Sequence, residues 1–330
     1  MIDLHLHLDG SLEPEFMLTL AKQQNLNLSL EKIKERAICK NDCSSLTEYL
    51  KCFELPLSLL QTEDALMQAT FHVMERLDRQ NICYAEIRFA PQLHMRRGLS
   101  IDGAISAVVQ AMNEANRVLR VKGQVILCCM RGGNENKLQN IATIELGRNY
   151  LGHGVCAVDL AGDEAKYKTK DFSYLFELCK GIDMPFTIHA GESDGVDSVK
   201  SAIEFGCTRI GHGIALKNSE FLIRTVAQKH IGIEMCPSSN LQTKAIKSLE
   251  EFPVREFLDY GILATINTDN MTVSNTTIDN EFEVLKNGIG LTGEEKKKLI
   301  CNAIRVSFLN ESDKTKLLLK VLTGLNEKNI

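Results

Sequence analysis

Short runs of apolar residues recur along the chain, and each run is nearly continuous in hydrophobic character rather than alternating with polar residues. Such runs are typical of strands that are buried on both faces of a parallel sheet. The pattern predicts eight strands, which cover residues 2–7, 82–90, 124–130, 154–162, 184–192, 209–216, 231–239 and 262–270.

Between most of the predicted strands lies one stretch with helical periodicity. In residues 102–120, for example, Ile105, Val108, Val109 and Met112 fall on one stripe, as expected for an amphipathic helix. Strands that alternate with helices predict an α/β fold, and eight such units predict a (β/α)8 barrel of the TIM type. An open doubly wound sheet would instead need a glycine-rich phosphate turn after an early strand, and none lies there.

The first interval between strands, residues 11–80, is much longer than the others and contains several helical candidates, among them a run over 62–79. Ser45 and Glu48 have the spacing of a capping box. No proline- or glycine-rich linker bounds the interval. We therefore interpret residues 1–330 as a single barrel domain, with 11–80 as a helical insertion over the catalytic mouth that could act as a lid. Apolar stripes after the eighth strand predict extra C-terminal helices.

The bulk composition narrows the class of protein. The chain has 330 residues, a net charge of -5, 44% hydrophobic and 25% charged residues, which is ordinary for a globular protein. Mild acidity argues against nucleic acid as a partner, and no apolar run approaches the roughly 20 residues that span a bilayer. Position 1 leads directly into a strand without a basic and apolar leader, so we expect a cytoplasmic protein. The 11 cysteines, an odd number, are expected to be free thiols.

Polar residues collect where the predicted strands end. In the first strand, His5 and His7 are one residue apart and Asp9 follows, so the three side chains should project from one face. The ends of four later strands carry the other candidates: Gly162, His189, Glu192, His212, Asp269 and Asn270.

Taken one at a time, these residues have ordinary explanations. A lone histidine in an apolar strand is more often a core residue than a ligand, and an aspartate after a strand usually caps a turn. However, four of the eight histidines fall at these strand ends, where barrels of this type gather their chemistry. The set therefore predicts a functional site.

The residue types in this set suit a metal-dependent hydrolase. Imidazole and carboxylate ligands favour a borderline divalent cation, and we expect His5, His7, His189 and Asp269 to bind Zn²⁺. The same ligands would also hold Co²⁺, Fe²⁺ or Ni²⁺. The fourth strand ends without the lysine that often bridges two metals, so we expect one ion per chain.

Two further residues are candidates for moving protons. A metal ion would make hydroxide available near neutral pH, and His212 could orient the water or act as its base. Glu192 lies three residues after His189, beyond a glycine, and is placed to be a proton donor or shuttle rather than a ligand.

The motifs "LHLHLDGSL", "DLAGDE", "HAGE", "GHG", "CPSSN" and "NTDN" resemble those of the adenosine deaminase family of the amidohydrolase superfamily, in the same order over residues 1 to about 290. The resemblance implies hydrolysis of adenosine and 2′-deoxyadenosine to inosine and 2′-deoxyinosine, with release of ammonia. Glu192 would protonate N1 of the purine while hydroxide attacks C6. His212 would hold and help deprotonate the water, assisted by Asp269.

The resemblance also implies four residues that contact substrate. His7 lies in this part of the site, the backbone N–H of Gly162 would reach N3, and Asp9 would meet the ribose hydroxyls. Asn270 stands where better-known members have a second aspartate that contacts N7. Because N7 is an acceptor and an amide NH2 donates at any pH, Asn270 can fill that role.

Other functions remain open from the sequence. The same chemistry could act on adenine, an adenosine nucleotide or a 5′-modified adenosine. The similar adenine deaminases tend to carry glutamate at the position of Asp9, so the shorter side chain favours a nucleoside. A more distant alternative is a non-catalytic nucleoside-binding protein on this scaffold, which should lack at least one ligand or proton donor. The oligomeric state is not indicated.

Overall fold

The computed structural model describes residues 1–40 and 42–327. Within them lie the eight predicted strands, several of them shorter than the apolar runs. Their bounds are β1 (Ile2–His7), β2 (Tyr84–Phe89), β3 (Lys122–Met130), β4 (Val155–Ala161), β5 (Thr187–Ala190), β6 (Arg209–His212), β7 (Gly232–Met235) and β8 (Leu263–Ile266).

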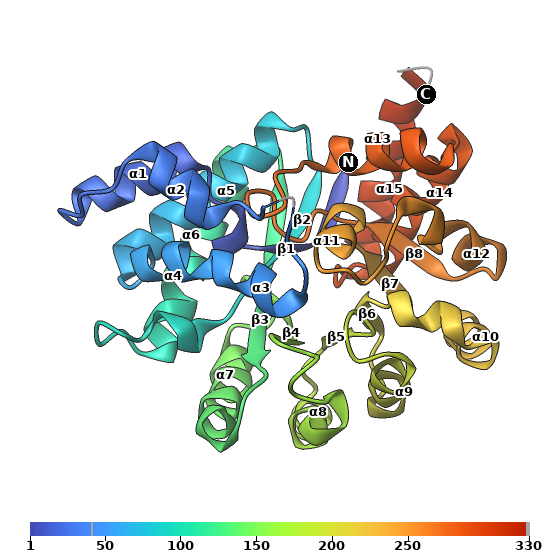
Figure 1. Ribbon diagram of the computed structural model, residues 1–330, viewed down its shortest axis with the longest axis horizontal. Coiled ribbons are helices and arrows are strands. Elements are labelled where there is room, and N and C mark those ends of the chain that lie inside the picture. Colours follow the sequence, from blue (N-terminus) through green and yellow to red (C-terminus); the bar gives the residue numbers. More distant parts are fainter. Residues whose placement is uncertain (41, 328–330) are drawn as a thin grey trace.

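Helices surround the central strands (Figure 1). Their bounds are α1 (Pro14–Gln23), α2 (Leu30–Ala37), α3 (Leu46–Tyr49), α4 (Glu54–Leu59), α5 (Glu63–Arg79), α6 (Ile101–Val118), α7 (Lys137–Asn149), α8 (Ser173–Gly181), α9 (Val196–Phe205), α10 (Glu220–Gln228), α11 (Pro237–Gln242), α12 (Val254–Asp259), α13 (Ile278–Ile289), α14 (Gly293–Val306) and α15 (Glu311–Glu327). Short 3₁₀ turns add, among others, η1 (Asp9–Ser11), η2 (Leu50–Phe53) and η5 (Thr169–Phe172). In the described part of the chain, none of the helices combines the length and the apolar character needed to cross a bilayer.

All strand pairs are parallel and follow the order of the sequence. The ladders form two four-stranded sheets, β1–β4 and β5–β8. Isolated bridges join their edges at two seams, Leu6 with Asp269 and Val158 with Phe186. The (β/α)8 barrel of TIM type is therefore confirmed, with ladder hydrogen bonding interrupted at the two seams. The predicted C-terminal helices are present as α14 and α15.

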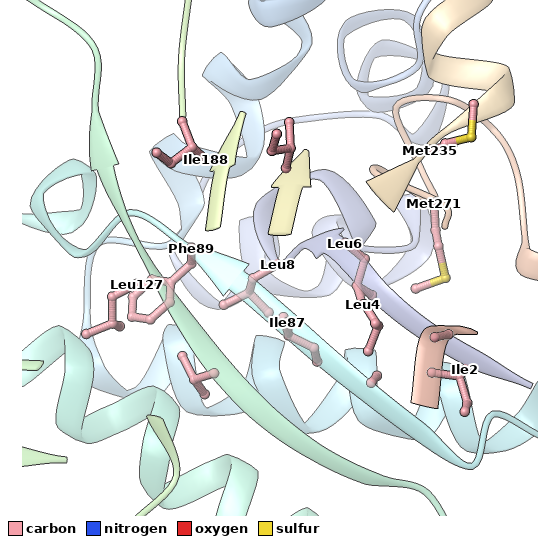
Figure 2. Close-up of a cluster of buried hydrophobic side chains, with 14 of the residues drawn as sticks. Ile2, Leu4, Leu6, Leu8, Ile87, Phe89, Leu127, Ile188, Met235 and Met271 are labelled. Atoms are coloured by element: carbon pink, nitrogen blue, oxygen red, sulfur yellow. The ribbon is translucent and has the colours of Figure 1, made fainter. Parts of the chain in front are cut away.

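The first strand shows how the barrel separates packing from chemistry. Ile2, Leu4 and Leu6 lie in one buried hydrophobic cluster with side chains of β2 and β3 (Figure 2). The alternate residues point the other way, because side chains alternate along a strand. One of them, His5, reaches Glu234 on β7 across the barrel interior.

The long first interval divides into two parts. Helix α5 packs against α6, as a regular helix of the outer ring would, and α1 to α4 precede it. At the start of α3, the Ser45 hydroxyl accepts a hydrogen bond from the Glu48 amide. The Glu48 carboxylate accepts from the amide and hydroxyl of Ser44 instead of from the Ser45 amide, so only half of the predicted capping box forms.

Candidate active site

A cavity of about 230 Å³ opens at the carboxyl ends of the strands, which is where a barrel of this type places its chemistry. It is lined by residues from strand ends and from the segment before α5. The lining residues are His7, Asp9, Leu46, Tyr49, Leu50, Phe53, Leu57, Ala90, Leu93, Cys128, Met130, Arg131, Ala161, Gly162, Asp163, His189, Glu192, His212, Asp269 and Asn270.

The imidazole rings of His5, His7 and His189 lie close together beside this cavity, and His7 and His189 line it. Nε2 of His5 lies 3.4 Å from Oδ1 of Asp269, and Nε2 of His7 lies 3.3 Å from the same oxygen. Nε2 of His189 lies 3.3 Å from Nε2 of His7. The predicted ligands come from β1, β5 and the loop after β8, and folding brings them to one point.

These residues fit a metal ion. One ligand atom each of His5, His189, His212 and Asp269 lies within 4.8 Å of the others. This group includes His212, which was not predicted as a ligand, and does not include the predicted ligand His7. The buried Nε2 of His5 and Oδ1 of Asp269 have no hydrogen-bond partner, which is costly unless a ligand satisfies them. The donor set of neutral imidazoles and one carboxylate is one that Zn²⁺ and its neighbours prefer.

The protonation states of His7, His189, His212 and Asp269 also suit ligation, which requires neutral imidazole and ionised carboxylate. For His5, burial and Arg88 oppose protonation, but the contacts with Asp269 and Glu234 raise the pKa of the ring overall. Burial lowers the pKa values of His7, His189 and His212. Burial opposes ionisation of Asp269, but its contacts with the histidines hold the pKa of this carboxyl well below its usual value.

Buried charged side chains contact the Nδ1 atoms of two of the histidines and so orient their rings. Nδ1 of His5 lies 2.7 Å from Glu234, and Nδ1 of His189 lies 2.8 Å from Asp159. The guanidinium of Arg88 on β2 donates to both carboxylates, at 2.8 Å each, and to the carbonyl of Leu4. Such partners fix the ring orientation of a metal-binding histidine. Arg88, Asp159 and Glu234 were not predicted, although each is a charged residue inside an apolar strand.

The two proposed proton-handling residues lie beside this cluster. Nε2 of His212 is 3.7 Å from Oε2 of Glu192. Burial and the nearby Asp269 carboxylate raise the pKa of Glu192 well above its usual value, so the protonated, donating form is favoured. The amide nitrogen of Asn240, on α11, lies 3.0 Å from Nδ1 of His212. Asn240 was likewise not predicted.

Two of these residues have unusual backbone conformations. His212 has φ +61° and Asp269 has φ +57°, values in the left-handed region that non-glycine residues seldom adopt. Strain of this kind persists at functional sites when the surroundings impose it. No sequence pattern predicts it.

All four predicted substrate contacts, His7, Asp9, Gly162 and Asn270, line the cavity. Asp9 does so for a different reason from the one expected: β1 ends at His7, and Asp9 begins the 3₁₀ turn η1. The expectation that the strand repeat places it on the face of the histidines is therefore wrong. Burial raises the pKa of Asp9 to about 6. Gly162 follows β4 with φ +104°, a conformation that suits only glycine.

Asn270 makes a contact that the sequence did not indicate. Its amide NH2 donates to the hydroxyl of Tyr49, on α3, at 3.0 Å. The Tyr49 hydroxyl is in turn 2.7 Å from Oγ of Ser274. The segment before α5 therefore reaches the strand-eight end of the site.

Known proteins resemble this chain over nearly its whole length. A sequence profile described as adenosine deaminase matches residues 1–323. The adenosine deaminase of Haemophilus ducreyi is 46% identical over 325 residues, covering 96% of this chain and 94% of the relative. That of Clostridium perfringens is 37% identical over 325 residues, covering 97% of each chain.

Solved structures agree on the fold. An adenine deaminase from Arthrobacter aurescens superposes with a TM-score of 0.89 at 24% identity, covering 98% of both chains. The Arabidopsis protein ADAL in complex with GMP gives a TM-score of 0.86 at 23% identity, covering 98% of this chain and 96% of the other. With the matching profile and curated relatives, these findings show that the chain belongs to the adenosine deaminase family.

Proposed function

We propose that this protein hydrolyses adenosine and 2′-deoxyadenosine to inosine and 2′-deoxyinosine, releasing ammonia. The observation that carries the proposal is the cluster of His5, His7, His189 and Asp269 beside Glu192 at the cavity, in which the Nε2 atoms of His5 and His7 lie 3.4 and 3.3 Å from Oδ1 of Asp269. The names of the curated relatives point to the same reaction.

In this proposal one Zn²⁺ is held by His5, His7, His189 and Asp269. When bound, the ion supplies Lewis acidity that lowers the pKa of water into the neutral range. Arg88 supports the ligands indirectly, because it binds the two carboxylates behind His5 and His189.

Glu192, His212 and Asp269 perform the proton chemistry. Glu192, protonated in its buried position, donates to N1 of the purine and so makes C6 more electrophilic. Asn240 can only donate to Nδ1 of His212, so a neutral ring carries its proton on Nε2. We therefore assign His212 the role of orienting the attacking water, and Asp269 the role of accepting its proton.

The substrate is held by groups that match its edges. The Gly162 amide donates to N3, the Asn270 amide donates to N7, and Asp9 accepts from the ribose hydroxyls, with His7 beside the reacting carbon. The chain segment over the mouth, within residues 11–80, acts as a lid. Support for the lid comes from Leu46, a residue of that segment that lines the cavity.

A nucleoside is favoured over a nucleotide. Arg131 is the one lysine or arginine among the described residues that line the cavity. Its guanidinium already donates to the carbonyls of Tyr167 and His189 and to the hydroxyl of Thr169. Three of its five N–H groups are thus engaged within the protein, and no second lysine or arginine lines the described cavity to pair with a phosphate, whereas ADAL has been solved with GMP and with IMP bound.

The test is a panel assay on the purified, zinc-loaded protein. Adenosine, 2′-deoxyadenosine, adenine, AMP and a 5′-alkylthio adenosine are followed by loss of absorbance at the adenine maximum, with the Glu192→Gln variant as control. We expect turnover of the two nucleosides and almost none by the variant. Turnover of adenine alone would overturn the substrate assignment. A stoichiometrically loaded protein without any turnover would favour the non-catalytic nucleoside-binding alternative.

A further inference from the structure

Glu192 is carried by a short loop between β5 and α9 rather than by a regular element. Gly191, before it, has φ +77°, and a Cβ on this residue would come within 2.4 Å of Val199. The loop is therefore tightly confined. Among the described residues, the amides of Gly191, Glu192 and Ser193 donate to no main-chain carbonyl, so a side chain from outside the loop satisfies them.

That partner is Glu164, a buried residue of the loop after β4. Its Oε1 accepts from the amide of Gly191 at 2.6 Å and from the hydroxyl of Ser198. Its Oε2 accepts from the amides of Glu192 and Ser193, at 2.8 and 2.7 Å. One carboxylate thus binds three successive N–H groups around the proposed proton donor.

The number and strength of these hydrogen bonds make the contact between Glu164 and the loop rigid. An ionised carboxylate has about four acceptor positions, and in Glu164 four donors occupy them. Hydrogen bonds to a charged acceptor are roughly twice as strong as neutral ones. A second brace lies beside the first, since Arg131 donates to the carbonyl of His189 at 2.6 Å and to Thr169, whose hydroxyl is 2.6 Å from that of Ser198.

We propose that Glu164 is a positioning residue for the reaction: it fixes the Glu192 carboxyl in place by binding the main chain on both sides of it. Glu164 is not among the residues that line the cavity, so it acts through Glu192 rather than on substrate. The inference rests on the proposed role of Glu192 and extends it to a residue in the other half of the barrel.

The test variant is Glu164→Gln, which keeps the shape of the side chain. The NH2 then faces either the amides of Glu192 and Ser193, or the amide of Gly191 and the Ser198 hydroxyl, which can also accept. At least one contact with a main-chain amide therefore becomes donor against donor. We expect kcat for adenosine to fall about 100-fold, as for a misplacement of roughly 1 Å in a catalytic group. KM and bound zinc should stay close to the wild-type values.

A double-mutant cycle separates positioning from general damage. If Glu164 acts through Glu192, adding Glu164→Gln to Glu192→Gln should cause little further loss of kcat. Hydrogen exchange of the amides at 191–193 should quicken in Glu164→Gln. The matched control is Glu295→Gln, because Glu295 also accepts from a main-chain amide, that of Thr292, but lies in α14; kcat should not change.

Several results would overturn the proposal. One is an unchanged kcat in Glu164→Gln, and another is a full 100-fold loss in the Glu192→Gln background as well. If Glu164→Gln does not fold, Ser198→Ala, which removes one of the four bonds, must lower kcat in the wild-type background and not in the Glu192→Gln background. A wild-type protein that does not deaminate adenosine would instead contradict the proposed function, and the exchange measurement would still test the loop contact.

Discussion

At the scale of single residues, Asn270 is the clearest test of substrate recognition. Asn270→Ala removes the proposed donor to N7 and should raise KM and lower kcat, with kcat/KM falling about 10- to 100-fold, the cost of one lost hydrogen bond to a buried group. Asn270→Asp should keep substantial activity, because a protonated carboxyl can still donate. Steady-state kinetics on adenosine provide the measurement.

The control uses a substrate without the acceptor. With 7-deazaadenosine, the wild-type protein and Asn270→Ala should have similar kcat/KM. Equal kinetics of the two proteins on adenosine would contradict the contact with N7.

Functional residues on regular strands could be predicted from the sequence. Residues whose roles depend on tertiary contacts could not. His5 and His7 could be recognised because every second side chain of a strand lies on the same face, a rule that depends only on local sequence. The rule does not hold for Asp9, because β1 has ended and η1 begins there. Glu164 and Asn240 end two of the quoted motifs, "DLAGDE" and "CPSSN", but the sequence assigned them no role. Their partners lie about 28 residues away along the chain, and only the closed barrel brings them together.

At the scale of elements, the segment over the mouth is the part whose behaviour matters most. Helix α5 could be predicted from its apolar periodicity. Helix α3, in the segment over the mouth, has four residues, which is too short for a helical repeat to be recognised. Its position over the cavity depends on tertiary contacts such as that between Tyr49 and Asn270.

Tyr49→Phe should loosen this lid. The change removes the hydroxyl that binds Asn270 and Ser274, and each such bond contributes about 1 kcal/mol. Amide exchange over residues 44–57, measured by mass spectrometry, should be several-fold faster than in the wild type. Bound nucleoside should slow exchange in the wild type. Equal exchange with and without nucleoside would contradict a closing lid.

At the scale of the whole molecule, Arg88 ties the two sheets together. It binds Asp159 of β4 and Glu234 of β7 with no exposed side-chain surface. Arg88→Met would leave the buried Asp159 without a guanidinium partner and would leave Glu234 with Arg209 alone, at a cost of about 3–5 kcal/mol in unfolding free energy. We expect a lower Tm and faster loss of zinc to a chelator. Arg255→Met, at a partly exposed ion pair, is the control and should retain zinc as the wild type does.

Stability should also depend on pH through His94. Nδ1 of this buried ring is 2.6 Å from the Leu60 carbonyl, and burial lowers the pKa of His94 to about 4. The unfolded chain takes up the proton near pH 6.5, so the folded state loses stability as pH falls from about 6.5 to 4, by up to about 3 kcal/mol. In His94→Asn, which keeps a donor for Leu60, this loss should be absent. Denaturant melts of this variant and of the wild type at several pH values provide the measurement.

The two seams of the barrel have a consequence for assembly. One seam is made by Asp269 itself, whose amide and carbonyl pair with the main chain of His5 and His7. One half of the barrel supplies two of the proposed ligands and the other half supplies the other two, so neither half alone has a complete set. A bound ion would therefore fasten the halves together. Its removal should uncouple their melting, and separately expressed halves should reassemble more readily when the ion is present.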